Sequence, residues 1–286
     1  MTNLQGKTIV ITGSSRGLGF EIARQVLQSG GNVVISSRSQ SAVDAALQQL
    51  TPPGQSSDHV AGIAADVADI QQVRTLALAA IATFGSFQVW INNAAISGPY
   101  GPFFQVDPAT AHALINTNIA GAYHGSLVAS QYFLRCGQGK LINILGRGAK
   151  SPAPFQSLYS ASKAWLRSFT SSLAKEIDNP AIGVFAFNPG MMLTDLLTHV
   201  EVIAGSEERL KAFPTVIRLL AHPPSKAAKK AIWIASAATE GKTGKIYSMT
   251  STLSMLAGGV SYLWQKVTRQ ATTETDLQIN TVEPFE

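Results

Sequence analysis

The chain has 286 residues, of which 45% are hydrophobic and only 14% are charged, and its net charge is +5. So few charges exclude an intrinsically disordered chain, and the length is enough to bury a sizeable core. The single cysteine, Cys136, excludes an internal disulfide and a cysteine-rich metal site, and the histidines lack metal-ligand spacing. We therefore expect no bound metal and a reducing compartment.

Short runs of β-branched and other apolar residues alternate with longer amphipathic patterns along the chain. The runs are typical of fully buried strands and comprise Thr8–Thr12, Asn32–Ser36, His59–Ala65, Gln88–Asn92, Lys140–Leu145 and Gly183–Phe187. The patterns between them indicate helices at Gly17–Ser29, Gln40–Leu50, Asp69–Phe84, Asp107–Leu134 and Ser157–Asp178. Strands separated by such helices need right-handed crossovers, so we predict an α/β fold with a Rossmann-type, doubly wound parallel sheet.

The later part of the chain has a different character. We predict one Rossmann-type domain over residues 1–250, with a lid at about 196–225, and a C-terminal extension at 251–286. The uncharged stretch Ile246–Gln265 is half Ser, Thr, Gly and Tyr, so it fits an interfacial or subunit-contact segment better than a membrane span. Met1–Gly6 is too short for a signal peptide. We expect a cytoplasmic protein that is at most peripheral to a membrane.

The positive charge is concentrated in residues 209–269, which contain ten Lys and Arg residues and one acid, Glu240. No recognition motif for nucleic acid accompanies this charge, so we expect no nucleic-acid partner. A solvated surface is the commonest reason for such a run, and an anionic substrate or an anionic membrane surface comes next.

The first predicted strand leads directly into a glycine-rich loop, residues 12–19, with the sequence TGSSRGLG, and a helix follows. Glycines in this place allow a tight turn and let backbone N–H groups approach a pyrophosphate at the helix N-terminus. The spacing is G-x-x-x-G-x-G rather than G-x-G-x-x-G, and glycine turns also join strands to helices for purely structural reasons. Its position between a strand and a helix favours a dinucleotide site.

The end of the second predicted strand bears on the choice of cofactor. A site for NAD has an acid there to bind the ribose hydroxyls, but this chain has Ser36, Ser37 and Arg38. Arg38, together with Arg16 in the glycine loop, supplies cations for a 2′-phosphate. The pair favours NADPH over NADH, although either arginine alone is also compatible with surface decoration.

Tyr159 and Lys163 are four residues apart, which places both side chains on one face of a predicted helix. A phenol is a poor acid at neutral pH, and a neighbouring ammonium lowers its pKa. A chance pairing of surface residues is the alternative interpretation.

The glycine loop, Asn92-Asn93-Ala94, Tyr-x-x-x-Lys and Asn188-Pro189-Gly190 occur in the order found in short-chain dehydrogenases/reductases, and the chain resembles that family over roughly residues 5–250. The resemblance implies that Tyr159 is the general acid in reduction and that Lys163 lowers its pKa and binds the nicotinamide ribose. It also implies that Asn118 holds a proton-relay water. The cofactor contacts that we expect are Gly13, Ser15, Arg16, Gly17, Leu18, Gly19, Ser37, Arg38, Asp66, Val67, Asn93, Ala94, Tyr159, Lys163, Pro189, Gly190 and Thr194.

The chain departs from the family pattern at two positions. The fourth residue of Asn-Asn-Ala-Gly is Ala95, a mild change in a structural turn. The catalytic serine of the family, thirteen residues before the tyrosine, is Gly146 here. Loss of that hydroxyl would cost ~10²–10³ in rate, by comparison with an oxyanion-hole donor. Ser157 and Arg147 are the candidates to replace it.

One branch of the family shares this glycine. In Gly146, Gly148 and the run Pro189–Leu197 the chain is similar to chlorophyll b reductase-like members, which reduce a formyl group on a chlorin ring. That resemblance implies a large, planar, apolar substrate. The predicted lid would suit such a substrate because it contains Leu196, Leu197, Val200, Val202 and Ile203.

Two functions from different classes remain open. The first is an NADPH-dependent oxidoreductase that reduces an aldehyde or ketone on a hydrophobic substrate. The second is a cofactor-binding sensor or scaffold with little turnover, because Gly146 has removed a hydroxyl. The family resemblance also suggests that Ala109–Leu134 and Ser157–Asp178 pair across a dimer axis, giving a homodimer or homotetramer; internal packing is the alternative.

Overall fold

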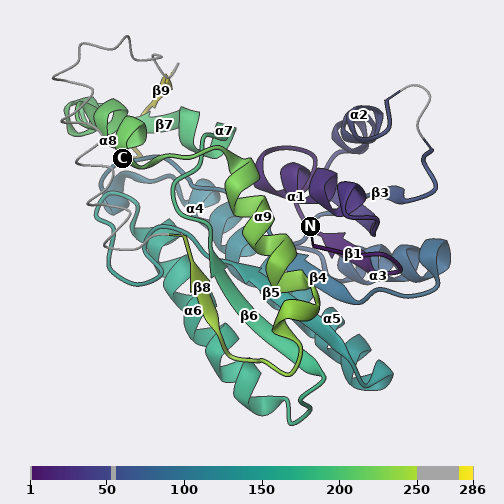
Figure 1. Ribbon diagram of the computed structural model, residues 1–286. Helices are drawn as coiled ribbons and strands as arrows, with labels where there is room; N and C mark the ends of the chain where they lie inside the picture. Colours follow the sequence, from purple (N-terminus) through teal and green to yellow (C-terminus); the bar gives the residue numbers. More distant parts are fainter. Residues whose placement is uncertain (1, 53–55, 250–276, 286) are drawn as a thin grey trace, which may run out of the picture.

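Seven parallel strands form the central sheet of the computed structural model, in which residues 2–52, 56–249 and 277–285 are described (Figure 1). The strand order is β3-β2-β1-β4-β5-β6-β8, so the direction of winding reverses between β1 and β4. In such sheets ligands bind at this switch point, outside the carboxyl ends of the strands. The predicted fold class is therefore confirmed. The strands are β1 Thr8–Ile11, β2 Asn32–Ser37, β3 Val60–Ala64, β4 Val89–Asn92, β5 Gly139–Ile144, β6 Ile182–Asn188 and β8 Ile246–Ser248.

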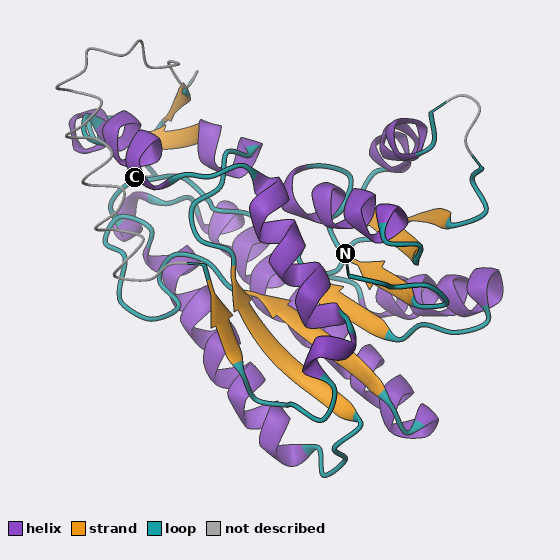
Figure 2. Ribbon diagram, viewed as in Figure 1, coloured by secondary structure: helices purple, strands orange, loops and turns teal. Residues whose placement is uncertain are grey.

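Helices cover both faces of the sheet (Figure 2). They are α1 Gly17–Gln28, α2 Gln40–Leu50, α3 Ile70–Phe84, α4 Pro108–Ile115, α5 Gly121–Cys136, α6 Ser157–Glu176, α7 Asp195–Thr198, α8 Phe213–Leu220 and α9 Pro224–Ala235. Helices α1, α2 and α9 pack on one face, and α3, α5 and α6 pack on the other. Both faces of the strands are thus buried, which is why they appear in the sequence as continuous apolar runs.

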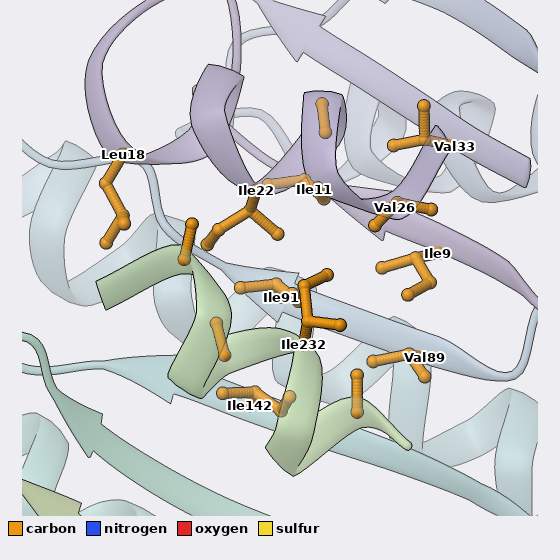
Figure 3. Close-up of a cluster of buried hydrophobic side chains, with 14 of the residues drawn as sticks. Ile9, Ile11, Leu18, Ile22, Val26, Val33, Val89, Ile91, Ile142 and Ile232 are labelled. Carbon is orange, nitrogen blue, oxygen red and sulfur yellow. The ribbon is translucent and has the colours of Figure 1, made fainter. Parts of the chain in front are cut away.

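Neighbouring residues of one strand point to opposite faces and so enter different cores. Ile9 and Ile11 of β1 join the cluster beneath α1 and α9, whereas Val10 between them joins the cluster on the other face. Figure 3 shows the first cluster, in which Ile22 of α1 and Ile232 of α9 meet the strand side chains. This packing holds β1, and the loop that follows it, firmly in place.

The predicted helix Asp107–Leu134 is interrupted in the structure. Helix α4 ends at Ile115, a π-helical turn occupies Asn116–Ala120, and α5 begins at Gly121. A π-turn widens the helix by one residue and often marks a functional site. Asn118 lies at its centre, where the side chain makes hydrogen bonds outside the helix.

The region after residue 223 contains two elements that the sequence analysis missed. Helix α9 packs along α1, and its buried face consists largely of alanines. The short strand β8 pairs with β6, so Tyr247 belongs to the sheet. The Tyr247 ring packs edge-on against Trp233 of α9, with 5.4 Å between the ring centroids.

The predicted lid is a small layer of its own beside the carboxyl edge of the sheet (Figure 1). It contains α7, α8 and the strand β7, His199–Ile203, which pairs in parallel with β9, Gln278–Val282. Tyr100 bridges to β7 on its other side. Val202 and Ile203 are completely buried, so these two lid residues form the core of this layer.

The described helices include none that is long and apolar enough to cross a membrane. The interpretation of Ile246–Gln265 as an interfacial segment concerns residues that lie, after Met249, outside the described part of the chain.

A buried lysine on β5 joins the sheet to the turn that follows α9. The Nζ of Lys140 donates hydrogen bonds to the main-chain oxygen of Ser236 and, at 3.0 Å, to the hydroxyl of Thr239. No acid is paired with it among the described residues, and burial lowers the pKa of Lys140 to about 8.

Lys140→Met should therefore change how stability depends on pH. Between the folded pKa, about 8, and the ordinary lysine pKa, the unfolded chain binds more protons, so stability rises with pH. From about pH 7.5 to about pH 9.5 the wild type should gain of order 1 kcal/mol of unfolding free energy that the variant lacks. Urea unfolding at both pH values measures this difference.

The matched control for this prediction is Lys175→Met, which removes an exposed lysine near the end of α6. Equal pH dependence in wild type and in Lys140→Met would show that Lys140 does not titrate in this range.

Candidate active site

The glycine loop between β1 and α1 lies so close to the end of β4 that two of its residues have no room for a side chain. A Cβ built at Gly13, where φ is +61°, would lie 2.7 Å from the Cα of Ala94. A Cβ at Gly19 would lie 2.5 Å from the Nδ2 of Asn93. Only glycine fits at both positions.

Hydrogen bonds fix the same contact. The Asn93 amide donates to the main-chain oxygens of Gly13, at 2.8 Å, and Thr12, at 3.0 Å. In return, the Thr12 hydroxyl accepts from the backbone N–H groups of Asn93 and Ala94, at 3.1 and 3.2 Å. These hydrogen bonds hold the loop in its shape without a ligand. Asn93 and Ala94 therefore have a structural role, which is to fix the glycine loop against the end of β4.

The loop presents the beginning of α1 as a site for an anion. Arg16 is the N-cap residue, and no side chain caps the helix, so the first N–H groups are available. Gly17 and Gly19 leave these groups uncovered. The Leu18 side chain is buried in the core, so this residue offers a ligand its backbone N–H.

Several other predicted cofactor residues lie at or directly after the carboxyl ends of strands. Ser37 ends β2 and Arg38 follows it, Asp66 and Val67 follow β3, and Pro189 and Gly190 follow β6. The predicted residue Thr194 lies beside the glycine loop: the distance from a Cβ built at Gly17 to the Thr194 Cβ would be 3.7 Å. The structure thus brings the predicted set together along one edge of the sheet.

The two arginines at this edge are exposed but differ in their partners. Arg16 forms an ion pair with Asp195 at the start of α7, with 3.4 Å between Nη1 and Oδ2. Arg38 is paired with no acid within the described part of the chain. Beside it, the buried hydroxyl of Ser36 has no hydrogen-bond partner there. The end of β2 therefore has both a free cation and an unused polar group.

Tyr159, Lys163 and Asn118 are all buried near the ends of β4 and β5. Lys163 donates to the main-chain oxygen of Ile144 at 3.1 Å, and its Nζ lies 5.6 Å from the centroid of the Tyr159 ring. The Asn118 amide exchanges two hydrogen bonds of 2.9 Å with the main chain of Ile96. These bonds use the Asn118 side chain to hold the loop after β4.

The expected effect of Lys163 on Tyr159 is not what the structure shows. Burial raises the pKa of Tyr159 to about 12 and lowers the pKa of Lys163 to about 8. Desolvation disfavours the charged form of each group. The ammonium makes its hydrogen bond to a main-chain oxygen instead of the phenol, so burial dominates for both residues.

Gly146 has a reason to be glycine that the sequence did not reveal. A Cβ at this position would lie 2.4 Å from the hydroxyl oxygen of Tyr159. In this structure the Tyr159 hydroxyl occupies the space, so a side chain at residue 146 would require the tyrosine to shift. Of the two suggested replacements for the hydroxyl, Ser157 lines the pocket beside Tyr159, whereas Arg147 is exposed and does not line it.

A pocket of about 310 Å³ opens beside Tyr159. Its walls come from the loop after β4, from α4 and from the segment before α6, and most of them are apolar. Its polar side chains are Ser97, Thr110, Gln156, Ser157 and Tyr159.

Among the pocket residues that sequence reasoning missed, Phe155 has an unusual backbone conformation. It is the one residue other than glycine with a positive φ, +65°, in the described part of the chain. No sequence pattern predicts a positive φ at a phenylalanine. The signal that could have placed Phe155 near the site was its position four residues before Tyr159.

No three His, Cys, Asp or Glu side chains gather as metal ligands would within residues 2–52, 56–249 and 277–285.

Comparison with known proteins gives one matching family and several similar relatives. The model of the short chain dehydrogenase family matches residues 7–202. The probable chlorophyll(ide) b reductase NYC1, chloroplastic, of Arabidopsis thaliana is 32% identical over 207 residues, which are 67% of this chain and 42% of that protein. The chain therefore spans less than half the length of this plant relative.

Two further proteins match over most of their length. The 3beta-hydroxysteroid dehydrogenase 1 of Eggerthella lenta is 32% identical over 243 residues, covering 85% of this chain and 91% of that protein. The crystal structure of 3-ketoacyl-(acyl-carrier-protein) reductase from Brucella melitensis, complexed with NADH, is similar with a TM-score of 0.77 and 26% identity. This match covers 88% of this chain and all of that one.

The contact between Gly146 and Tyr159 predicts strong coupling between substitutions at the two positions. Gly146→Ala should lower the unfolding free energy by about 1–3 kcal/mol, because the new methyl group overlaps the Tyr159 hydroxyl. The same substitution in a Tyr159→Phe background should cost less, since that oxygen is gone. Denaturant unfolding of the four proteins measures a coupling of about 1 kcal/mol or more. Additive effects would show that the hydroxyl lies elsewhere.

Proposed function

Because the chain belongs to the short chain dehydrogenase family, we propose that it is an NADPH-dependent oxidoreductase that reduces the aldehyde or ketone group of a hydrophobic substrate. The observation that carries this proposal is the buried Tyr159, which faces an apolar pocket at the same sheet edge as the glycine loop. A proton donor, a dinucleotide loop and a hydrophobic pocket together are what carbonyl reduction requires.

The residues at this edge fit a nicotinamide dinucleotide. The uncapped N-terminus of α1 suits the pyrophosphate, and the cradle at Gly13 and Gly19 leaves backbone close enough to touch it. Arg38, which forms no ion pair with an acid of the described residues, supports a 2′-phosphate and hence NADPH. When bound, the cofactor supplies the hydride that reduces the carbonyl carbon.

The chain's own part in the reaction is to hold and deliver a proton. At neutral pH the raised pKa of Tyr159, about 12, keeps the phenol protonated. Reduction places negative charge on the carbonyl oxygen, and an alkoxide is a stronger base than a phenolate, so the transfer from the Tyr159 hydroxyl is favourable. The resting site therefore holds the protonated phenol that reduction needs as its proton donor, and the phenolate left after the transfer takes up a proton again before the next turnover.

Lys163 and Asn118 position this donor. Lys163, with a pKa of about 8, is held by the main chain of Ile144 at the base of the site, where we assign it contact with the nicotinamide ribose. Asn118 fixes the loop after β4 through Ile96 and, through the hydroxyl of Ser162, the main chain of Tyr159. The apolar walls exclude water from the reacting carbonyl.

We propose the formyl group of a chlorophyll b-type pigment as the candidate substrate. The similarity to the plant relative supports it, as does the apolar pocket. The space that the pocket walls enclose is small beside a chlorin ring, and part of it is open to solvent. Only the formyl-bearing edge of a chlorin would therefore enter, with the rest of the ring lying across the mouth of the pocket.

A cofactor-binding protein with little turnover is the second candidate, and the absence of a hydroxyl at Gly146 is the observation that favours it. The two candidates differ in one simple measurement. An enzyme oxidises NADPH when it is mixed with a panel of apolar aldehydes, including a formyl-bearing pigment. A sensor or scaffold binds NADPH without consuming it.

Tyr159→Phe tests the proton donor. The ring keeps its packing but loses the proton, so turnover should fall ~10²-fold or more while NADPH still binds. Tyr123→Phe, at an exposed site on α5, is the control and should keep full activity. Loss of NADPH absorbance gives the rate, and titration gives the dissociation constant. Activity that survives in Tyr159→Phe would mean that a different group donates the proton.

Arg38→Asp tests the choice of cofactor. The new carboxylate repels a 2′-phosphate and can accept hydrogen bonds from ribose hydroxyls, so preference for NADPH over NADH should fall more than tenfold, or about 1.4 kcal/mol. Fluorescence titration with both nucleotides measures the preference. Arg135→Asp makes the same charge change at an exposed position on α5 and should leave it unaltered. An unchanged preference in Arg38→Asp would remove Arg38 from the site.

A further inference from the structure

The pocket beside Tyr159 has one wall that the backbone holds under strain. Phe155 lines the pocket with φ at +65°, a strained conformation for a residue other than glycine. Its main-chain oxygen accepts a hydrogen bond of 2.9 Å from Gly101, and its ring lies 5.7 Å from the ring of Tyr100. Both partners belong to the loop after β4, so the surrounding structure keeps the Phe155 ring in the pocket wall.

A cation from the lid lies over this ring. The guanidinium carbon of Arg209 is 4.2 Å from the centroid of the Phe155 ring. Arg209 belongs to a 3₁₀ turn, Glu207–Leu210, whose last residue is buried. Arginine over an aromatic ring gains cation–π attraction and keeps its N–H edges free to bind a carboxylate.

The charge of Arg209 has no acid paired with it in the described part of the chain. Its neighbour Glu208 forms an ion pair with Lys211, and Glu207 is exposed without such a pair. Arg209 is itself exposed, so an incoming group can reach it. An unpaired cation beside a substrate pocket is free to select the charge of the substrate.

The pocket itself has no charged lining residue. Burying a carboxylate there, without a cation, would be strongly unfavourable because the charge would lose its hydration. A substrate that carries an acidic group must therefore keep it outside the pocket. The guanidinium over Phe155 is an exposed cation in contact with the pocket wall, whereas Lys163, over the Tyr159 ring, is buried.

We propose that Arg209 binds a carboxylate of the substrate at the mouth of the pocket while the apolar walls hold the carbonyl-bearing ring. The preferred substrates are then flat, apolar carbonyl compounds that carry a carboxylate at some distance from the reacting group. This rests on the proposed carbonyl reduction, whose proton donor, Tyr159, lines the same pocket as Phe155.

The test uses the full chain with NADPH and two pairs of probes. 4-Formylbenzoate and 4′-formylbiphenyl-4-carboxylate are each compared with their methyl esters, which differ in charge and scarcely in shape. In the wild type, kcat/KM should be higher for the longer acid than for its ester, and this advantage should weaken with added salt. In Arg209→Gln the acid-to-ester ratio should fall about tenfold, because kcat/KM falls much more for the acid than for the ester.

Two further variants separate a specific contact from general electrostatics. Lys211→Gln removes an exposed cation of the same segment that does not lie over Phe155, and it should keep the wild-type ratio. Arg209→Lys keeps the charge without the planar fork and should retain part of the preference. An unchanged ratio in Arg209→Gln, or an equal loss on acid and ester, would overturn the proposal.

Binding without turnover distinguishes this proposal from the proposed function. Biphenyl-4-carboxylate has no carbonyl to reduce, and calorimetry should show it binding about tenfold more weakly to Arg209→Gln than to the wild type. If that difference appears while neither aldehyde is reduced, the anion site stands and the proposed reaction fails. If the aldehydes are reduced but the binding difference is absent, the anion site fails and the reaction stands.

Discussion

The close approach of the glycine loop to the end of β4 is the constraint on which the rest of the site depends. No side chain fits at Gly13 or Gly19, so the loop after β1 can lie directly against Asn93 and Ala94. Thr12 and Asn93 then exchange hydrogen bonds that lock two strand ends together. Because the winding of the sheet reverses between these strands, the locked loop defines one side of the crevice where a ligand belongs.

On the other side of the crevice, water is excluded from Tyr159 and Lys163. Each group shifts towards its uncharged form, the phenol to a pKa of about 12 and the ammonium to about 8. A protonated phenol and a lysine that loses its charge easily suit a site that gives up a proton during reduction. The Tyr159 hydroxyl occupies the space that a side chain at residue 146 would take.

Much of this arrangement could be predicted from the sequence, because it follows from buried strands and short motifs. Apolar runs located the first six strands of the sheet, and the motifs then fell at their carboxyl ends, since every strand is parallel. Strand β8 was missed because three residues are too few to show a periodic pattern. It is a strand because its backbone pairs with β6 at the edge of the sheet. Helix α9 was missed because it buries mainly alanines between its lysines, so its apolar face is weakly marked.

The features of the site that escaped prediction depend on contacts between distant residues. The overlap of Gly146 with the Tyr159 hydroxyl is a matter of tenths of an ångström, and motif spacing cannot express it. The pKa shifts reflect desolvation by surrounding structure, whereas the sequence offered only the proximity of a lysine to a tyrosine. The positive φ of Phe155 and the π-turn at Asn118 are local geometries imposed by the loop after β4, with which both residues share hydrogen bonds.

The pairing of β7 with β9 has a consequence for the order in which the protein folds. These strands are parallel and far apart in the sequence, so a long loop must close before they gain any contact. The sheet, by contrast, is built from successive strand–helix units with shorter connections. We expect the lid layer to form last and to open first, as a cooperative unit of lower stability than the sheet. Hydrogen exchange would then be faster at Val202 and Ile203 than at the equally buried Ile9 and Ile11.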